Sequence, residues 1–218
     1  MDHTRLSMTL GDAIFTQRAI RRFRPDPVPL ADLELIVSAA AKAPNGGNSQ
    51  IARFLAVNDP NLIREFGALY REAWWAKRRD MAGWTGPDDL SAAERAQWAS
   101  PMRLADEMGA VPCVVFALSV PPNVASSVLP ATQNLMLAAR ALGIGSVPTT
   151  LHPSVEDRFR EMFGIPAEVA FHFAIPLGYP AGSFGPTKRR STWETTYLNR
   201  WEGAVPWAPT AASSGPGS

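Results

Sequence analysis

Apolar residues recur along the chain at two spacings that distinguish helices from strands. The first helical pattern covers residues 30–42, where the apolar positions of one face follow the 3.6-residue period: Leu33, Ile36, Val37, Ala40 and Ala41. Asp32 and Glu34 favour this helix further, because carboxylates are stabilised near the positive end of the helix dipole. The run Pro-Asn-Gly-Gly-Asn at residues 44–48 is typical of a turn, so the helix is expected to end there.

The rest of the chain predicts an alternation of helices with short strands. Further helices are expected over residues 61–81, 91–108, 128–142 and 154–164, and short apolar runs predict strands over residues 54–57, 114–118, 146–150 and 170–177. Ser91 and Glu94 have the spacing of a capping box at the start of the helix over 91–108. The helix over 128–142 is apolar almost all round, which predicts a central position, and Gly143 is its expected C′ residue. This order of elements indicates an α+β fold, in which helices flank a small sheet.

Composition and charge exclude several classes of protein. With 46% hydrophobic and 19% charged residues among 218, the chain has enough apolar material for a compact core and too little charge for a disordered protein. The formal net charge of +1 argues against nucleic-acid binding through bulk charge. One cysteine and three separated histidines argue against a disulfide framework and against a metal site.

The sequence also shows no recognisable targeting signal and none of the common catalytic motifs. The start, from Met1 to Phe15, does not read as a signal peptide, and the longest apolar run, Val111–Val120, is shorter than the about 20 residues of a membrane helix. These features predict a cytoplasmic protein that binds no membrane. Gly143-Ile-Gly145 follows a helix and precedes a strand, whereas a dinucleotide fingerprint follows a strand and opens a helix.

Three clusters of polar residues have compositions that suit cofactor binding. Residues 17–24 hold four arginines before a proline-rich turn, and the planar fork of arginine suits phosphate oxygens; the alternative is a solvated basic face. Residues 44–50 combine glycines with Asn48 and Gln50, whose donors and acceptors match the imide edge of a heterocycle; the alternative is a turn that only ends a helix. Residues 185–190 carry a basic triplet, which either promotes solubility or meets the first cluster on one anionic group.

Taken in order, these motifs resemble the flavin-dependent nitroreductase family. The resembling runs are Arg18-Ala-Ile-Arg-Arg-Phe with Pro25-Asp-Pro-Val-Pro, Ala43-Pro-Asn-Gly-Gly-Asn-Ser-Gln, Gln133-Asn-Leu-Met-Leu-Ala-Ala-Arg-Ala-Leu-Gly-Ile-Gly, Pro176-Leu-Gly-Tyr-Pro and the basic arm. They extend from Thr16 to Trp201. The resemblance implies an α+β homodimer with two FMN molecules at the subunit interface and a C-terminal arm that embraces the partner.

Mapped on this chain, the resemblance implies one FMN-binding domain over residues 1–210, with a small, mainly antiparallel sheet flanked by helices. A helical lid insertion would cover about residues 70–108, and the dimer-embracing arm about residues 180–207. Residues 211–218 read as a disordered tail.

The resemblance also implies which residues bind the FMN phosphate. Arg18, Ala19 and Arg21 would lie along the phosphate, the ribityl chain and the ring edge, and Lys188 and Arg190 would close on the phosphate. A phosphate dianion needs converging cations, and these come from both ends of the chain.

Two departures from the family pattern bear on cofactor binding. Gln17 stands where the family often has a further arginine, so one phosphate-side donor is expected to be lost, with Arg22 or Lys188 as compensation. Ile51-Ala52 replaces a frequent Pro-Trp pair, which is expected to alter the packing beneath the cofactor.

The ring end of the cofactor is assigned in the same way. Asn48 and Gln50 would contact the polar edge of the isoalloxazine, and Thr150 and Leu151 would lie near its N5 atom. No side chain need act as a nucleophile or an acid, because a flavin carries the redox chemistry itself. Positive charge near the pyrimidine edge, for which Arg21 is the candidate, would stabilise the reduced flavin.

The implied activity is a ping-pong transfer of hydride from NAD(P)H to an electron-poor acceptor, such as a nitroaromatic, a quinone or an activated alkene. The lid insertion would cover the acceptor with aromatic side chains, for which the candidates are Trp74, Trp75, Trp84 and Trp98. The alternative for these tryptophans is a core or dimer contact. Cys113 is expected to be inert in a buried strand, His172 to have a structural role, and His152 to lie near the flavin.

Other functions remain open at this point. Reductive dehalogenation and oxygen-dependent flavin cleavage belong to branches of the same fold. A non-catalytic flavin-binding protein would also carry these motifs, and a basic interaction module would carry the arginines without a flavin.

Overall fold

The computed structural model describes residues 2–120 and 125–209 of the chain, so the expected tail over residues 211–218 lies outside the described part. The chain divides into two compact units, Met1–Pro186 and Thr187–Ser218. The division falls within the expected arm. The described part of the second unit contains one short 3₁₀ turn, Thr192–Glu194, and presents large apolar side chains to solvent: Trp193, Tyr197, Leu198, Trp201 and Trp207.

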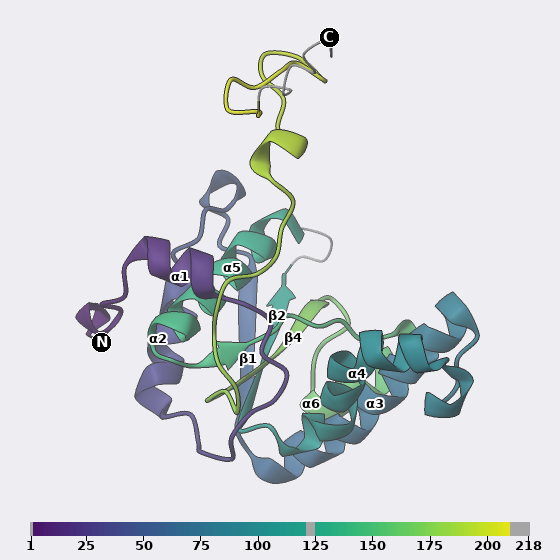
Figure 1. Ribbon diagram of the computed structural model, residues 1–218. Coiled ribbons are helices and arrows are strands. Elements are labelled where there is room, and N and C mark those ends of the chain that lie inside the picture. The colour runs from purple at the N-terminus through teal and green to yellow at the C-terminus, as the bar shows by residue number, and fades with distance from the viewer. Residues whose placement is uncertain (1, 121–124, 210–218) are drawn as a thin grey trace. The chain divides into compact units, whose positions relative to one another are not determined.

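The first unit is built on an antiparallel sheet of four strands, shown with its helices in Figure 1. The strands are β1 (Ala52–Val57), β2 (Cys113–Ser119), β3 (Gly145–Ser146) and β4 (Ala170–Gly178), in the spatial order β1-β2-β4-β3. The sequence correctly predicts an α+β fold with a small antiparallel sheet. The strand expected over residues 146–150 is wrong in length, because Pro148 has no N–H to continue the ladder. Thr149 still forms an isolated bridge with Ala174.

All five predicted helices are present in the predicted order, together with one further helix. They are α1 (Leu10–Thr16), α2 (Leu30–Ala40), α3 (Pro60–Ala82), α4 (Ala92–Glu107), α5 (Ala125–Ala141) and α6 (Glu156–Phe163). The short α1 was not predicted. The capping box at Ser91 is confirmed, and Gly143 follows α5 with the expected left-handed backbone, at φ +73°. Asp32, expected at the start of α2, is buried and forms an ion pair with Arg5.

Helices cover the two faces of the sheet (Figure 1), and a hydrophobic layer lies between the sheet and the helices on each face. One layer contains side chains of α3, α4 and α6, and the other contains side chains of α2 and α5. Strand β2 is buried along its whole length, and its residues alternate between the layers: Val114, Phe116 and Leu118 face the first, and Cys113, Val115 and Ala117 the second. Helix α5 contacts all four strands as well as α2, which confirms its central position.

Two residues of the sheet, His172 and Cys113, have the structural roles that the sequence indicates. The register between β2 and β4 shifts between Ala117 and Leu118, and His172 is the extra residue on β4. Its Nε2 atom lies 2.8 Å from the hydroxyl of Ser119, so the ring has a hydrogen-bond partner. Burial raises the pKa of the Cys113 thiol to about 12, and the thiol therefore stays protonated at neutral pH.

Among the residues that the structure describes, no helix combines the length and the hydropathy that a membrane span requires. The same residues contain no group of three or more His, Cys, Asp or Glu side chains placed to hold a metal ion.

Candidate functional site

The arginine-rich segment runs beside the edge of the sheet, where backbone hydrogen bonds fix it. Ala19 forms a parallel bridge with Ser146 of β3, and the Ile20 amide donates to the Ser146 carbonyl at 3.0 Å. Further along, the Ala181 amide donates to the Arg22 carbonyl at 3.0 Å. Gly145 explains how the segment comes so close, since a Cβ atom at this position would lie 2.7 Å from the Ile20 side chain.

This segment forms one wall of a cavity of about 490 Å³, which we call the arginine cavity. Helix α4 and the chain after β4 complete it, and its lining residues are Arg18, Ala19, Ile20, Arg21, Arg22, Ala99, Ser100, Arg103, Gly182 and Ser183. Four of the ten are arginines and none is acidic. Within residues 2–120 and 125–209, none of these four guanidiniums forms an ion pair. The cavity is therefore a strong candidate for binding an anion.

Arg24 provides a contrast within the same segment. Its Nε atom lies 3.2 Å from the Asp26 carboxylate, and its guanidinium lies over the Tyr179 ring at 5.3 Å. Arg24 is therefore already stabilised by the chain, whereas Arg18, Arg21 and Arg22 line the arginine cavity and pair with no carboxylate among the residues that the structure describes.

Arg21 is the half-buried member of the set. Burial lowers the pKa of its guanidinium, the neighbouring Tyr70 raises it, and Arg18 lowers it. An anion in the cavity would offset both the burial and the repulsion from Arg18. Tyr70 itself is buried, which raises the pKa of its hydroxyl; the Thr149 hydroxyl, Arg21 and Arg78 lower it.

Arg103 is a lining residue that the sequence did not reveal. It projects from α4, one turn after Ala99 and Ser100, which line the same cavity. The 3.6-residue period places the three residues on one face of the helix. It does not say which part of the chain that face meets, because this depends on how α4 packs in the fold.

The loop with Asn48 and Gln50 lies at the opposite end of the sheet from the arginine cavity. It precedes Ala52, which pairs with Ser119, whereas the arginine segment joins Ser146, which pairs with Leu177 at the other end of β4. A strand of six residues spans roughly 20 Å. The two clusters of one chain are therefore well separated.

The loop is a tight turn with its own small cavity. Asn48 and Gln50 both have a left-handed backbone, with φ of +53° and +49°, and the Gln50 amide donates to the Asn45 side chain at 2.9 Å. Gln50 lines a cavity of about 190 Å³, which shares no residue with the arginine cavity. The structure thus does not bring the two predicted FMN-binding clusters of one chain together.

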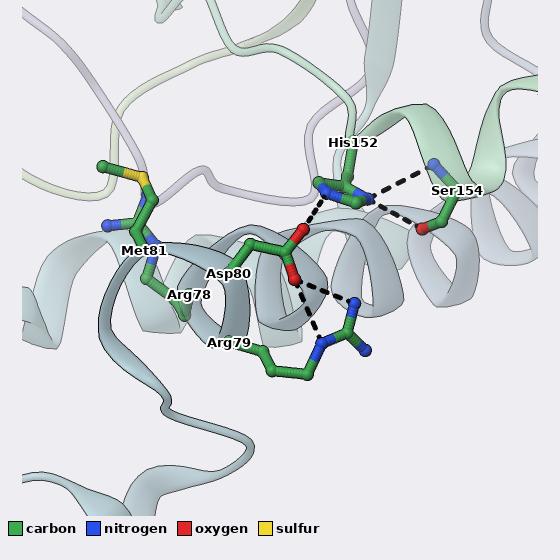
Figure 2. Close-up of polar contacts among 6 residues, drawn as sticks. All are labelled: Arg78, Arg79, Asp80, Met81, His152 and Ser154. Atoms are coloured by element: carbon green, nitrogen blue, oxygen red, sulfur yellow. Dashed lines mark hydrogen bonds and ion pairs between the residues drawn. The ribbon is translucent and has the colours of Figure 1, made fainter.

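The segment with Thr150 and Leu151 is attached to α3 by polar side chains. The Lys77 ammonium donates to the Thr150 hydroxyl, and the Nε2 atom of His152 lies 2.9 Å from the Asp80 carboxylate. Figure 2 shows Asp80 between His152 and Arg79, with Ser154 on the other side of the imidazole. The Glu72–Arg158 ion pair extends this contact, and we call the whole the α3 seam. Leu151 packs against the hydrophobic layer beneath α3.

The four candidate tryptophans have different surroundings. Trp74 is 8% exposed and belongs to the hydrophobic core, as the alternative interpretation proposed, and Trp75 packs edge-on against it at 4.7 Å. Trp84 and Trp98 form a second edge-on pair at 6.3 Å. The buried Arg78 guanidinium lies 4.4 Å from the Trp98 ring centre and 5.4 Å from that of Trp74. A role in covering the acceptor stays a prediction for all four.

Lys188 and Arg190 are exposed in the second unit of the chain. Their contact with a phosphate in the arginine cavity stays a prediction.

Comparison with known proteins identifies the family. Residues 14–179 match the model of the nitroreductase family. The chain belongs to this family. An NADH dehydrogenase of Thermus thermophilus is 30% identical over 192 residues, which cover 81% of this chain and 89% of that protein. A 5,6-dimethylbenzimidazole synthase of Rhodospirillum rubrum is 31% identical over 182 residues, which cover 78% of this chain and 81% of that protein.

A solved structure supports the fold of this nitroreductase-family chain. A crystal structure of oxidised iodotyrosine deiodinase bound to FMN and 3-iodo-L-tyrosine has a TM-score of 0.68. At 23% identity, the match covers 84% of this chain and 96% of the deiodinase chain. Relatives with such different names show that the family and the fold leave the reaction open.

Proposed function

We propose that the protein is an FMN-dependent oxidoreductase that takes electrons from NAD(P)H and passes them to an electron-poor organic acceptor. The acceptor class comprises nitroaromatics, quinones and activated alkenes. The arginine cavity carries this proposal, because it offers four guanidiniums without a carboxylate partner to an anion. The family membership and a relative named as an NADH dehydrogenase support a flavin oxidoreductase.

The residues of the cavity fit the phosphate end of FMN. A phosphate monoester carries up to two negative charges, and arginine binds its oxygens in pairs. Arg18 and Arg22 would hold the phosphate from the sheet edge, and Arg103 would hold it from α4. Arg103 thus offers the cation that the sequence lacks at Gln17. Lys188 and Arg190 of the arm would add further charge.

The separation of the two clusters supports a homodimeric site. The arginine segment and the Asn48–Gln50 loop of one chain lie at opposite ends of the sheet, which favours a site in which each holds a different FMN. We therefore assign each FMN to the arginine cavity of one protomer and to the Asn48–Gln50 loop of its partner. The arm after about residue 180 would embrace the partner, and this domain organisation, like a cytoplasmic location, remains our proposal.

The chemistry of the site divides between the cofactor and the protein. When bound, FMN supplies the capacity to accept and return a hydride at its N5 atom. The protein binds and orients: Arg21 would place positive charge near the pyrimidine edge, and the Thr150 hydroxyl would lie beside N5. No side chain is assigned as a nucleophile or an acid.

A second candidate keeps the cofactor and changes the reaction. Relatives named as a dimethylbenzimidazole synthase and an iodotyrosine deiodinase make flavin cleavage and reductive dehalogenation the alternatives within this fold. Turnover of a nitroaromatic or quinone with NADH or NADPH, under air and under nitrogen, separates the three. Flavin loss that requires oxygen would indicate cleavage, and halide release from a halogenated phenol would indicate dehalogenation.

The absorbance spectrum of the purified protein tests the cofactor. The expected result is a yellow protein with about one FMN per chain that oxidises NADH or NADPH when an acceptor is added. A yellow protein without turnover would instead be a flavin carrier. A colourless protein that does not take up added FMN, and that binds polyanions in a salt-sensitive manner, would overturn the proposal in favour of a basic interaction module.

A further inference from the structure

The ammonium group of Lys77, on α3, contacts a hydroxyl group rather than a carboxylate. Its Nζ atom donates to the Thr150 hydroxyl and lies 3.5 Å from the Thr150 carbonyl oxygen. The side chain is half-buried and, within the described part of the chain, it pairs with no carboxylate. A half-buried ammonium therefore has a neutral hydroxyl as its main contact.

The surroundings of Lys77 add to this cost. Burial lowers the pKa of its ammonium, and the adjacent Arg78 lowers it further. The two nearest acidic residues of α3 are already engaged, Glu72 by Arg158 and Asp80 by His152 and Arg79. A desolvated cation held without an anion is unfavourable, and an electron-rich group beside Thr150 would offset the cost.

The hydrogen bond also fixes the role of the Thr150 hydroxyl. An ammonium has three donors and no acceptor, so the Thr150 oxygen must accept from Lys77. The hydrogen of that hydroxyl is then directed toward some other acceptor. Lys77 therefore makes the Thr150 hydroxyl a hydrogen-bond donor toward a group other than Lys77.

The α3 seam holds Lys77 in this position. Three residues after Lys77, on the same side of α3, Asp80 bonds His152 at 2.9 Å (Figure 2). The Ser154 amide donates to the Nδ1 atom of His152 at 3.2 Å, so the Nε2 atom carries the hydrogen that Asp80 accepts. Helix α3 and the loop are thus joined on the C-terminal side of Lys77, and on its N-terminal side Glu72 joins α3 to Arg158 of α6.

We propose that Lys77 is a positioning residue for the flavin: it holds Thr150 as a donor toward N5 and places a positive charge beside that edge of the ring. This inference rests on the proposed function, because it requires FMN next to Thr150. The reduced flavin is richer in electrons than the oxidised form, so the nearby charge stabilises the reduced form more. Lys77 thereby makes the bound flavin easier to reduce.

The midpoint potential of the bound FMN tests this role without any turnover. The protein is titrated with a reference dye as wild type, Lys77→Met, Lys77→Arg and the control Arg64→Met. Arg64 lies on the same helix, its side chain is exposed, and its guanidinium donates to Asn61 of its own turn. We expect Lys77→Met to lower the ratio of reduced to oxidised flavin about tenfold at a given potential, which for a two-electron couple is about 30 mV. Lys77→Arg keeps the charge and should retain most of the wild-type value.

A double-mutant cycle with Thr150→Val shows whether the effect passes through Thr150. If it does, the shift in potential of the double variant differs from the sum of the shifts of Lys77→Met and Thr150→Val. An unchanged potential in FMN-loaded Lys77→Met overturns the inference, and Lys77→Gln supplies the same comparison where the methionine variant does not fold. If the wild-type protein binds no FMN, the proposed function is overturned instead. The two outcomes are therefore distinguishable.

Discussion

The arginine cavity and the α3 seam are both rich in charge, but they hold their charges in opposite ways. The backbone fixes the arginine segment to Ser146, and within the described residues the guanidiniums that line the cavity pair with no carboxylate. In the seam, the side chains themselves make the contact, and Glu72 and Asp80 have cationic or imidazole partners. Charges that a fold leaves unpaired on a rigid support are suited to a ligand, whereas paired charges connect elements. Lys77 departs from this rule within the seam, which is why it carries the inference above.

The largest effect is expected from removing the cations of the cavity. Arg18→Ala together with Arg22→Ala should weaken FMN binding by at least a hundredfold, because a hydrogen bond to a charged group is worth about 1.5–3 kcal/mol. Fluorescence titration with FMN and with riboflavin measures the loss. Riboflavin lacks the phosphate, so its affinity should fall far less. Equal losses for both ligands would show that the arginines do not bind the phosphate.

Gly145→Ala should act on the support of the cavity rather than on its charge. The added Cβ would lie 2.7 Å from the Ile20 side chain, so the arginine segment must shift. Overpacking of this kind typically costs about 1–3 kcal/mol of folding free energy, and FMN affinity should fall with it. Urea denaturation and FMN titration measure the two effects. Gly86→Ala is the matched control, since a Cβ there meets nothing within 4 Å.

The sequence predicts the elements of the fold better than their contacts. Buried segments such as α2, α3 and β2 can be predicted from the sequence because burial requires apolar residues. These residues recur at helical spacing in α2 and α3 and form a continuous run in β2. Helix α1 is missed because it is short and its large apolar side chains are exposed, with Leu10 at 70% and Phe15 at 76%, while only the small Ala13 is buried. Its sequence therefore carries no pattern of burial.

The candidate site shows the same limit. Arg18, Arg21 and Arg22 are adjacent in sequence, and their role can be inferred from composition and family resemblance. The contact between Lys77 and Thr150 joins residues 73 positions apart, and Arg103 reaches the cavity through the packing of α4. Neither side chain differs in the sequence from an ordinary surface cation, because only the tertiary structure determines what it faces.

Arg103→Ala should have an intermediate effect that is confined to the phosphate. Arg103 is exposed and lies on a helix wall of the cavity, so solvent weakens its interaction with the phosphate. We expect FMN affinity to fall about tenfold, which is about 1.4 kcal/mol, and riboflavin affinity to stay unchanged. The control Arg64→Ala removes one positive charge elsewhere and should change neither affinity. If FMN affinity were unchanged and the KM rose for NADPH but not for NADH, Arg103 would instead be assigned to the 2′-phosphate of NADPH.

The smallest effect is expected from Asp80→Asn in the α3 seam. Hydrogen bonds from His152 and Arg79 lower the pKa of the Asp80 carboxyl. A carboxylate whose pKa is lower in the folded than in the unfolded state stabilises the fold above its unfolded pKa, about 3.9, and this contribution is lost as the pH falls through the folded pKa. The wild type should therefore have a slightly higher urea midpoint than Asp80→Asn at pH 7, and the difference should shrink below about pH 4.

Because Asp80 is exposed and does not line the arginine cavity, FMN affinity should not change with this substitution. A cycle with His152→Ala identifies the contact, since Asp80→Asn removes the charge of the acceptor, His152→Ala removes the donor, and the double variant should lose little more than His152→Ala alone. If the difference in urea midpoint were as large at low pH as at pH 7, the Asp80 contact would not depend on its charge. The α3 seam would then not stabilise the fold through paired charges, and it would no longer contrast in this way with the cavity, which binds through unpaired charges.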